Sequence, residues 1–211
     1  MIGACCAVSE KVAIMLDGGF VKKRLAKRLK RFPGVADVVG LCGNLMTATR
    51  LAGKDLFRIY YYDAPPLDGH SANPIDKTVI NFSVTTQATQ NRALIDSLEM
   101  EPDFAVRRGS LMHTGWKLGR SALKTLAKTP RPIAGTDLVP DITQKGVDIR
   151  IGLDIAWIAL KRVVDVLVLV TGDSDFIPVM KFARKEGLRV YLDPLSAPVR
   201  RDLKAHADFV F

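Results

Sequence analysis

The chain has 211 residues, of which 48% are apolar and 25% are charged. This composition argues against a disordered chain, and the length favours a single globular domain. No run approaches the roughly 18 apolar residues of a membrane-spanning helix, and residues 1–8 lack the features of an export signal. We therefore expect a cytoplasmic protein without a membrane partner. The three cysteines, Cys5, Cys6 and Cys42, have neither disulfide nor zinc spacing, and we interpret them as free thiols.

The net charge is +9, from 31 Lys and Arg against 22 Asp and Glu. A basic surface attracts polyanions without regard to their sequence, so RNA or DNA is the first partner to consider. The alternative is a charge that only keeps the protein in solution.

Apolar runs and helical periodicities alternate along the chain. The expected strands are residues 11–16, 56–62, 104–112, 164–170 and 188–192. The expected helices are residues 20–32, 36–51, 89–98, 147–161, 176–186 and 197–206. Strands that alternate with helices predict a three-layer α/β/α, Rossmann-like domain whose central sheet is mostly parallel.

Two segments lack a clear period. Residues 67–86 are rich in turn formers and are predicted to be a loop, while the prolines between Trp116 and Gln144 argue against regular structure. We expect a single domain over residues 1–211 with a basic insertion or flexible segment at about 114–144. No acidic residue occurs from Phe104 to Thr136, a window that includes Arg107, Arg108 and Lys117 as candidate RNA contacts. His113 and Trp116 could stack on unpaired bases or could be ordinary core residues.

Acidic residues follow the ends of two predicted strands. Asp17 comes directly after the first strand, and Asp173 and Asp175 follow the strand that ends at Val170. Asp148 opens the helix 147–161, with Asp154 six residues further on. The carboxyl ends of parallel strands line the crevice where ligands bind, so these side chains can converge there.

Gathered carboxylates repel one another unless a cation lies between them, and oxygen ligands suit Mg²⁺ or Mn²⁺. Such an ion can activate water and polarise a phosphodiester. An acidic metal site beside a basic surface indicates a nuclease. The alternative is structural: Asp173 or Asp175 could cap the next helix, Asp17 could form a turn before Gly18, and Asp148 could favour a helix dipole.

Three motifs carry a family resemblance: MLDGGF at residues 15–20, KGVD at 145–148 and LVTGDSDFIP at 169–178. In this order they resemble the NYN domain family, particularly its LabA-like branch, over most of the chain. The resemblance implies a PIN-like fold and Mg²⁺- or Mn²⁺-dependent cleavage of RNA. It implies that the catalytic, metal-binding carboxylates are those of Asp17, Asp148, Asp173 and Asp175, with Asp154 as a further candidate. Lys145 and Ser174 would contact the substrate.

Other functions fit the sequence less well. A phosphatase with an aspartyl intermediate needs a second Asp two residues after the first, and position 19 is Gly. Gly18 and Gly19 lack the spacing of a P-loop or dinucleotide site. The remaining rival is an RNA-binding or regulatory module that keeps the fold with little or no cleavage. Either function is compatible with a homo-oligomer.

Overall fold

The computed structural model describes residues 9–211. Its centre is a six-stranded sheet in which every neighbouring pair is parallel, in the order β10-β9-β8-β1-β2-β5. The strands are β1 (Lys11–Asp17), β2 (Asp55–Asp63), β5 (Phe104–Arg108), β8 (Val166–Val170), β9 (Arg189–Asp193) and β10 (Phe209–Val210). β1 and β8 lie in the middle because their side chains are apolar on both faces.

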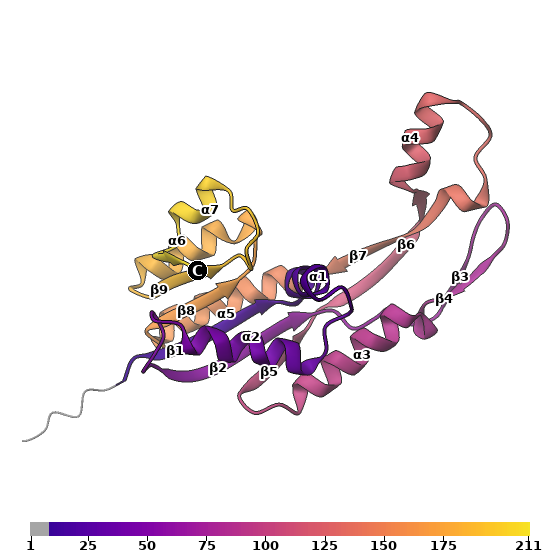
Figure 1. Cartoon of the computed structure of the whole chain (residues 1–211). Coiled ribbons are helices and arrows are strands. Elements are labelled where there is room, and N and C mark those ends of the chain that lie inside the picture. Colours follow the sequence, from indigo (N-terminus) through magenta and orange to yellow (C-terminus); the bar gives the residue numbers. More distant parts are fainter. Residues whose placement is uncertain (1–8) are drawn as a thin grey trace, which may run out of the picture.

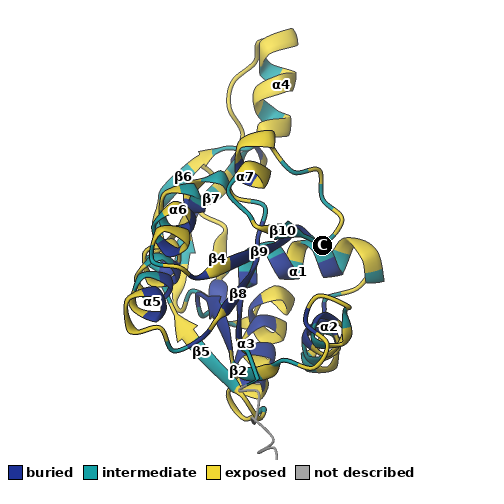
Figure 2. Cartoon of the chain, turned by 90° about the vertical axis from the view of Figure 1, so that its left-hand side faces the viewer, coloured by how far each residue is buried: buried dark blue, intermediate teal, exposed yellow. Residues whose placement is uncertain are grey.

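Helices cover both faces of this sheet (Figures 1 and 2). Successive residues of β1 belong to opposite core layers. Ala13 and Met15 pack with α5 (Val147–Lys161), α6 (Ile177–Lys185) and α7 (Arg201–Ala205). Ile14 and Leu16 pack with α1 (Gly18–Leu29), α2 (Val35–Thr47) and α3 (Thr86–Glu99). The predicted three-layer α/β fold with a mostly parallel sheet is confirmed.

Two antiparallel hairpins stand outside the sheet. The shorter joins β3 (His70–Ala72) to β4 (Val79–Asn81), and the longer joins β6 (Ser110–Leu118) to β7 (Leu138–Lys145). We call the longer hairpin, with α4 (Arg120–Lys128) between its strands, the arm. It extends away from the sheet and carries α4 at its tip (Figure 1). Helix α4 buries none of its residues, as its yellow and teal colours show in Figure 2.

The single strand predicted at 104–112 is wrong, because the structure divides it between β5 and β6. Gly109 makes the break: its N–H donates to Asp63 O at 2.7 Å. A Cβ there would lie 2.5 Å from Cγ2 of Val147, so the chain passes the start of α5 too closely for a side chain. The chain then leaves the parallel sheet and enters the arm.

Other boundaries also differ. The loop expected at 67–86 contains β3, β4 and a short 3₁₀ helix, η1 (Phe82–Val84), and the irregular structure expected between Trp116 and Gln144 includes most of the arm. The last helix is only Arg201–Ala205, followed by an unpredicted β10. Cys42 is a buried free thiol, whereas the interpretation of Cys5 and Cys6 lies outside the described residues. Within residues 9–211, no helix is long and apolar enough to cross a membrane.

Candidate functional site

The strand order changes direction between β1 and β8. From β1 the chain builds one half of the sheet through β2 and β5, and from β8 it builds the other through β9 and β10. Helices that leave such a pair of strands toward opposite faces open a crevice at their carboxyl ends, where α/β proteins bind ligands. Asp17 ends β1, and Asp173 lies just beyond the end of β8, so both acidic segments stand at this switch point.

Asp17 is fixed by two hydrogen bonds. It is the N-cap of α1, and its Oδ1 accepts the N–H of Phe20 at 3.1 Å. Its Oδ2 accepts from the hydroxyl of Thr171 at 3.1 Å, which ties the end of β1 to the turn after β8. The structural alternative expected for Asp17 was a turn before Gly18, whereas the structure shows a cap on α1, and the two bonds also fix the direction of the carboxylate.

The turn after β8 orders its own carboxylates. The buried Thr171 Oγ1 accepts the N–H of Asp173 at 3.2 Å, and Asp173 Oδ1 accepts the N–H of Asp175 at 2.9 Å. Asp173 thereby caps the 3₁₀ helix η3 (Ser174–Phe176) that leads into α6. Both carboxylates remain exposed. Phe20 packs so closely on Gly172 that a Cβ there would lie 2.8 Å from the ring, which draws α1 and this turn together.

Asp148 approaches the same place from the first turn of α5. Burial raises the pKa of Asp17, and the negative charges of Asp148 and Asp173 raise it further, against the effect of its two hydrogen bonds. Partial burial raises the pKa of Asp148, with added effects from Asp173 and Asp175. We call Asp17, Asp148, Asp173 and Asp175 the coupled carboxylates, because the charges of Asp148 and Asp173 act on Asp17 and those of Asp173 and Asp175 act on Asp148.

This coupled group fits a hard cation by its chemistry, since its donors are carboxylate oxygens and a positive charge would relieve their repulsion. It is not a closed cage. Within residues 9–211, no three Asp, Glu, His or Cys side chains stand close enough together to hold a metal ion. A cation here would require the exposed side chains of Asp148, Asp173 and Asp175 to turn toward Asp17.

Asp154 belongs to another network. Its Oδ2 accepts from the hydroxyl of Tyr62 at 2.8 Å and from Nε of Arg107 at 3.1 Å. The guanidinium of Arg107 also lies over the ring of Tyr60, 5.4 Å from its centroid. Asp154 thus joins α5 to β2 and β5, and its charge does not contribute to the raised pKa of Asp17 or Asp148.

The candidate substrate contacts are spread over several elements. Arg108 pairs with Glu99 and Asp96 of α3, and Lys117 pairs with Asp141 across the arm. Lys145 is exposed at the end of β7, three residues before Asp148. Ser174 Oγ accepts from Nη1 of Arg200 at 3.4 Å in the turn after β8. Ser174 thus lies between Asp173 and Asp175 in the turn and Lys145 just before the helix of Asp148, whereas the ion pairs of Arg108 and Lys117 lie on α3 and the arm.

The two aromatic candidates lie between the hairpins. Trp116 Nε1 donates to Ser71 Oγ at 3.1 Å, joining the arm to β3. The His113 ring lies 5.2 Å from that of Phe82, and its buried Nε2 has no hydrogen-bond partner among the described residues. Both rings are partly buried, so they support the base of the arm.

Sequence reasoning missed a buried ion pair beside the site. Asp63, which ends β2 and is 2% exposed, meets Nζ of Lys22 at 2.5 Å. The same Nζ donates to Asn91 Oδ1 at 2.6 Å, and the Tyr61 hydroxyl donates to Asp63 at 3.3 Å. The sequence contained a signal for Asp63, because Asp63 ends an apolar strand in the same way as Asp17 does.

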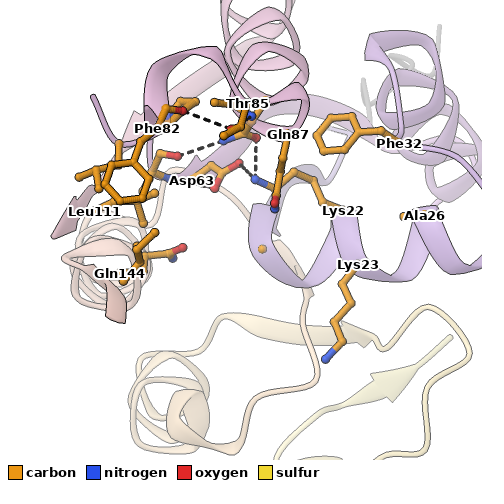
Figure 3. A pocket seen from close by; sticks show the side chains of 17 residues that line it. Lys22, Lys23, Ala26, Phe32, Asp63, Phe82, Thr85, Gln87, Leu111 and Gln144 are labelled. Carbon is orange, nitrogen blue, oxygen red and sulfur yellow. Dashed lines mark hydrogen bonds and ion pairs between the residues drawn. The ribbon is translucent and has the colours of Figure 1, made fainter. Parts of the chain in front are cut away.

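A cavity of about 550 Å³ opens next to this ion pair. It lies between α1, the start of α3 and the base of the arm (Figure 3). Figure 3 shows Phe82 and Leu111 on one side, Phe32 on the other, and the Lys22–Asp63 pair between them. Gly19 also lines the cavity, and a Cβ on Gly19 would lie 3.5 Å from Oδ1 of Asp17. The cavity therefore adjoins Asp17, one of the coupled carboxylates.

Comparison with protein families gives a match within the carboxy-terminal half of the chain. Residues 109–209 match the model of the NYN domain. The NYN match contains Lys145, Asp148 and the turn with Asp173 and Asp175. Asp17 lies outside the matched range and is joined to it in space through the Thr171 hydroxyl.

One solved structure resembles the chain over nearly its whole length. The crystal structure of VPA0982, a Vibrio parahaemolyticus protein of unknown function, aligns with a TM-score of 0.52 and 17% identity. The alignment covers 97% of this chain and 93% of that one, and at this identity it shows a shared fold. No curated protein sequence matches the chain.

Proposed function

We propose that the chain is a PIN-like NYN domain of the LabA-like type and that it cleaves RNA endonucleolytically with Mg²⁺ or Mn²⁺. The observation that carries this proposal is that the Thr171 hydroxyl binds both Asp17 and the N–H of Asp173 at the switch point between β1 and β8, with the charges of Asp148 and Asp175 close by. The NYN match over residues 109–209 supports it independently.

The four carboxylates would hold the metal, which when bound lowers the pKa of water and polarises the phosphodiester. Asp17 is the preorganised member, since Phe20 and Thr171 fix both of its oxygens. Asp148, Asp173 and Asp175 are exposed and can turn toward an incoming ion. Asp154 stays a weaker candidate for a metal ligand because its carboxylate already accepts hydrogen bonds from Tyr62 and Arg107.

Basic side chains around this edge would hold the RNA backbone. Lys145 and Ser174 flank the carboxylates and are the nearest candidates for a scissile phosphate. Arg107, Arg108 and Lys117 are already paired with acidic partners, so RNA phosphates would compete with those partners for them. Their contribution would therefore be to affinity along the strand.

A second function, RNA binding with little or no cleavage, is favoured by one observation. No three acidic side chains within residues 9–211 form a ready metal cage, and Asp17 and Asp173 both act as caps. In this second function the carboxylates only order the loops, and the basic surface binds the RNA. A homo-oligomer is compatible with both functions.

The deciding experiment incubates the purified protein with labelled single-stranded and structured RNAs in Mg²⁺, Mn²⁺ or EDTA. We expect internal cuts that require the metal. Asp173→Asn should lower the rate at least 100-fold, as removal of a metal-bound carboxylate does in metal-assisted hydrolysis, where the bound ion supplies several kcal/mol.

The matched control is Asp103→Asn. Asp103 precedes β5 at the amino-terminal edge of the sheet, and its positive φ of 63° is one that Asn also accepts. This variant should cut at the wild-type rate. Absence of metal-dependent cleavage in every RNA, or full cleavage by Asp173→Asn, would reject the ribonuclease proposal, and RNA binding without cleavage would favour the second function.

A further inference from the structure

The cavity beside Asp17 has the dimensions and lining of a small-ligand site. Its volume of about 550 Å³ falls within the roughly 300–1,000 Å³ that such sites span. Most of its wall is apolar, provided by Phe32, Phe82, Leu111 and Ile142 together with smaller side chains. An apolar wall of this extent favours a flat, weakly hydrated group over an ion.

The polar groups of the cavity are few and differ in availability. The ammonium of Lys22 already forms an ion pair with Asp63 and a hydrogen bond with Asn91. These bonds hold Lys22 in place at the floor of the cavity. Gln87 of α3 and Gln144 of β7 are exposed and line the cavity from different elements, and each carries both a donor and an acceptor. Paired amides can hydrogen-bond the donor and acceptor edge of a nucleobase.

The position of the cavity relates it to a nucleic-acid strand. Gly19 joins it to the carboxylate of Asp17, and Gln144 joins it to Lys145 and, four residues on, Asp148. Lys23 is exposed at the rim, where its ammonium points away from the Lys22–Asp63 pair (Figure 3). A base in the cavity would leave its phosphate facing this lysine or the coupled carboxylates.

We propose that this cavity binds one unpaired nucleobase of the RNA strand, next to the phosphodiester that the carboxylates act on. The assignment rests on the proposed function and makes the cavity its substrate-reading subsite. The base enters edge first toward Gln87 and Gln144 and packs on the apolar wall. A base held in a duplex cannot enter, so the site selects single-stranded segments or extruded nucleotides.

Ala26→Trp tests the assignment by filling the cavity from α1, where Ala26 lines it. Binding of a short mixed-sequence single-stranded RNA is measured in EDTA, so no cleavage is needed for the readout. We expect about ten-fold weaker binding, since one stacked base contributes about that much to affinity, and no change for the matching duplex. Ala36→Trp is the control, because Ala36 is an exposed alanine on α2, which does not line the cavity.

An abasic scan identifies the base that enters. A single abasic ribose is placed at each position of the RNA in turn, and binding is measured for the wild type and for Ala26→Trp. We expect one position at which the missing base weakens the wild type about ten-fold and leaves Ala26→Trp unaffected. If Ala26→Trp does not fold, the same scan is made with Gln87→Ala and Gln144→Ala, both at exposed positions.

The outcomes separate the two proposals. The wild type could cut RNA with metal while wild type and Ala26→Trp bind equally well at every abasic position. That result overturns the nucleobase site and still supports the ribonuclease proposal. If Ala26→Trp weakens binding in EDTA and no metal supports cutting, the nucleobase site is supported and the ribonuclease proposal is rejected. Equal weakening of single strand and duplex by Ala26→Trp also overturns the site, because a duplex offers no unpaired base.

Discussion

At the scale of single residues, Asp17 combines a structural role with an electrostatic cost. It caps α1 and binds Thr171, yet burial and the charges of Asp148 and Asp173 raise its pKa. A carboxyl whose folded pKa lies above its unfolded value, near 3.8, binds more protons when folded. Its contribution to stability therefore falls as the pH rises from the unfolded pKa through the folded one.

Asp17→Asn should accordingly stabilise the metal-free protein at neutral pH. The amide keeps an oxygen that can accept from Phe20 or Thr171, and it removes a charge that burial and the neighbouring carboxylates disfavour. Thermal unfolding in EDTA should give a higher midpoint for the variant at pH 7, with the difference shrinking as the pH falls below the unfolded pKa of 3.8, where Asp17 becomes protonated in both states. Added Mg²⁺ should raise the midpoint of the wild type only. A lower midpoint for the variant at pH 7 would show that the charge of Asp17 does not destabilise the folded protein.

The Lys22–Asp63 pair predicts a different pattern of stability. Lys22→Met leaves Asp63 charged, 2% exposed and without its cation, a change that costs about 3 kcal/mol in buried pairs. The double variant Lys22→Met with Asp63→Asn removes both charges and should recover much of that loss. Urea unfolding of the two variants and of Asp63→Asn alone measures the coupling energy. Additive losses would show that the two side chains do not interact.

At the scale of elements, the junction of β1 and α1 is the most constrained. A Cβ on Gly18 would lie 2.6 Å from the carbonyl oxygen of Tyr62 and 2.9 Å from the ring of Tyr61. The helix can therefore begin directly at the end of the strand only because position 18 has no side chain. This close approach places Asp17 and Asp63 at the same edge of the sheet.

Gly18→Ala should destabilise the protein by about 1–3 kcal/mol, the usual cost of forcing an extra methyl group into a packed site. Gly152→Ala is the control: Gly152 lies within α5 with nothing within 4 Å of its added Cβ, so the substitution should stabilise by about 0.5–1 kcal/mol. Chemical denaturation measures both. Equal effects of the two substitutions would mean that the junction is not tight.

The elements also show what the sequence could predict. The central strands were recognised because residues such as Val166 and Val170 are apolar on both faces. The arm was missed because β6 and β7 are exposed or half-exposed along their length, so no apolar period marks them. Pro140 argued against a strand, yet it sits in β7 opposite Trp116, next to a register shift in a ladder with only one partner strand.

The candidate site was predictable in part for a related reason. Asp17, Asp173 and Asp175 follow apolar strands, and parallel topology brings such ends together. Whether they gather into a metal site stays a prediction. The pairing of Asp63 with Lys22 depends on how α1 rotates over β2, and no local pattern in the sequence specifies that rotation.

At the scale of the whole molecule, the charge of +9 predicts salt-sensitive RNA binding. Arg120, Lys124 and Lys128 lie four residues apart on α4, so they share one face of the helix at the tip of the arm. Their replacement by Ala should leave the unfolding midpoint unchanged because α4 buries nothing. If the arm contacts RNA, the slope of log Kd against log salt should fall by about 1 for each lost phosphate contact.

The control for this measurement is Lys161→Ala with Lys185→Ala, at the ends of α5 and α6 near the amino-terminal edge of the sheet. These losses should change the salt slope less than the α4 replacements do. An unchanged slope for the α4 variant would show that the tip of the arm does not contact RNA, and it would leave the coupled carboxylates and their cleavage untouched.

The arm leaves and re-enters the body at neighbouring points. Ser110 pairs with Lys145 in the last register of the β6–β7 ladder, and Gly109 holds the departing chain against Asp63. The chain beyond this pair is an insertion whose two ends are adjacent, and its base lines the cavity through Leu111, Ile142 and Gln144. The part beyond Trp116 and Pro140, including α4, lines no part of the cavity, so its length and sequence can vary between homologous chains while the parallel sheet, the cavity and the carboxylates stay in place.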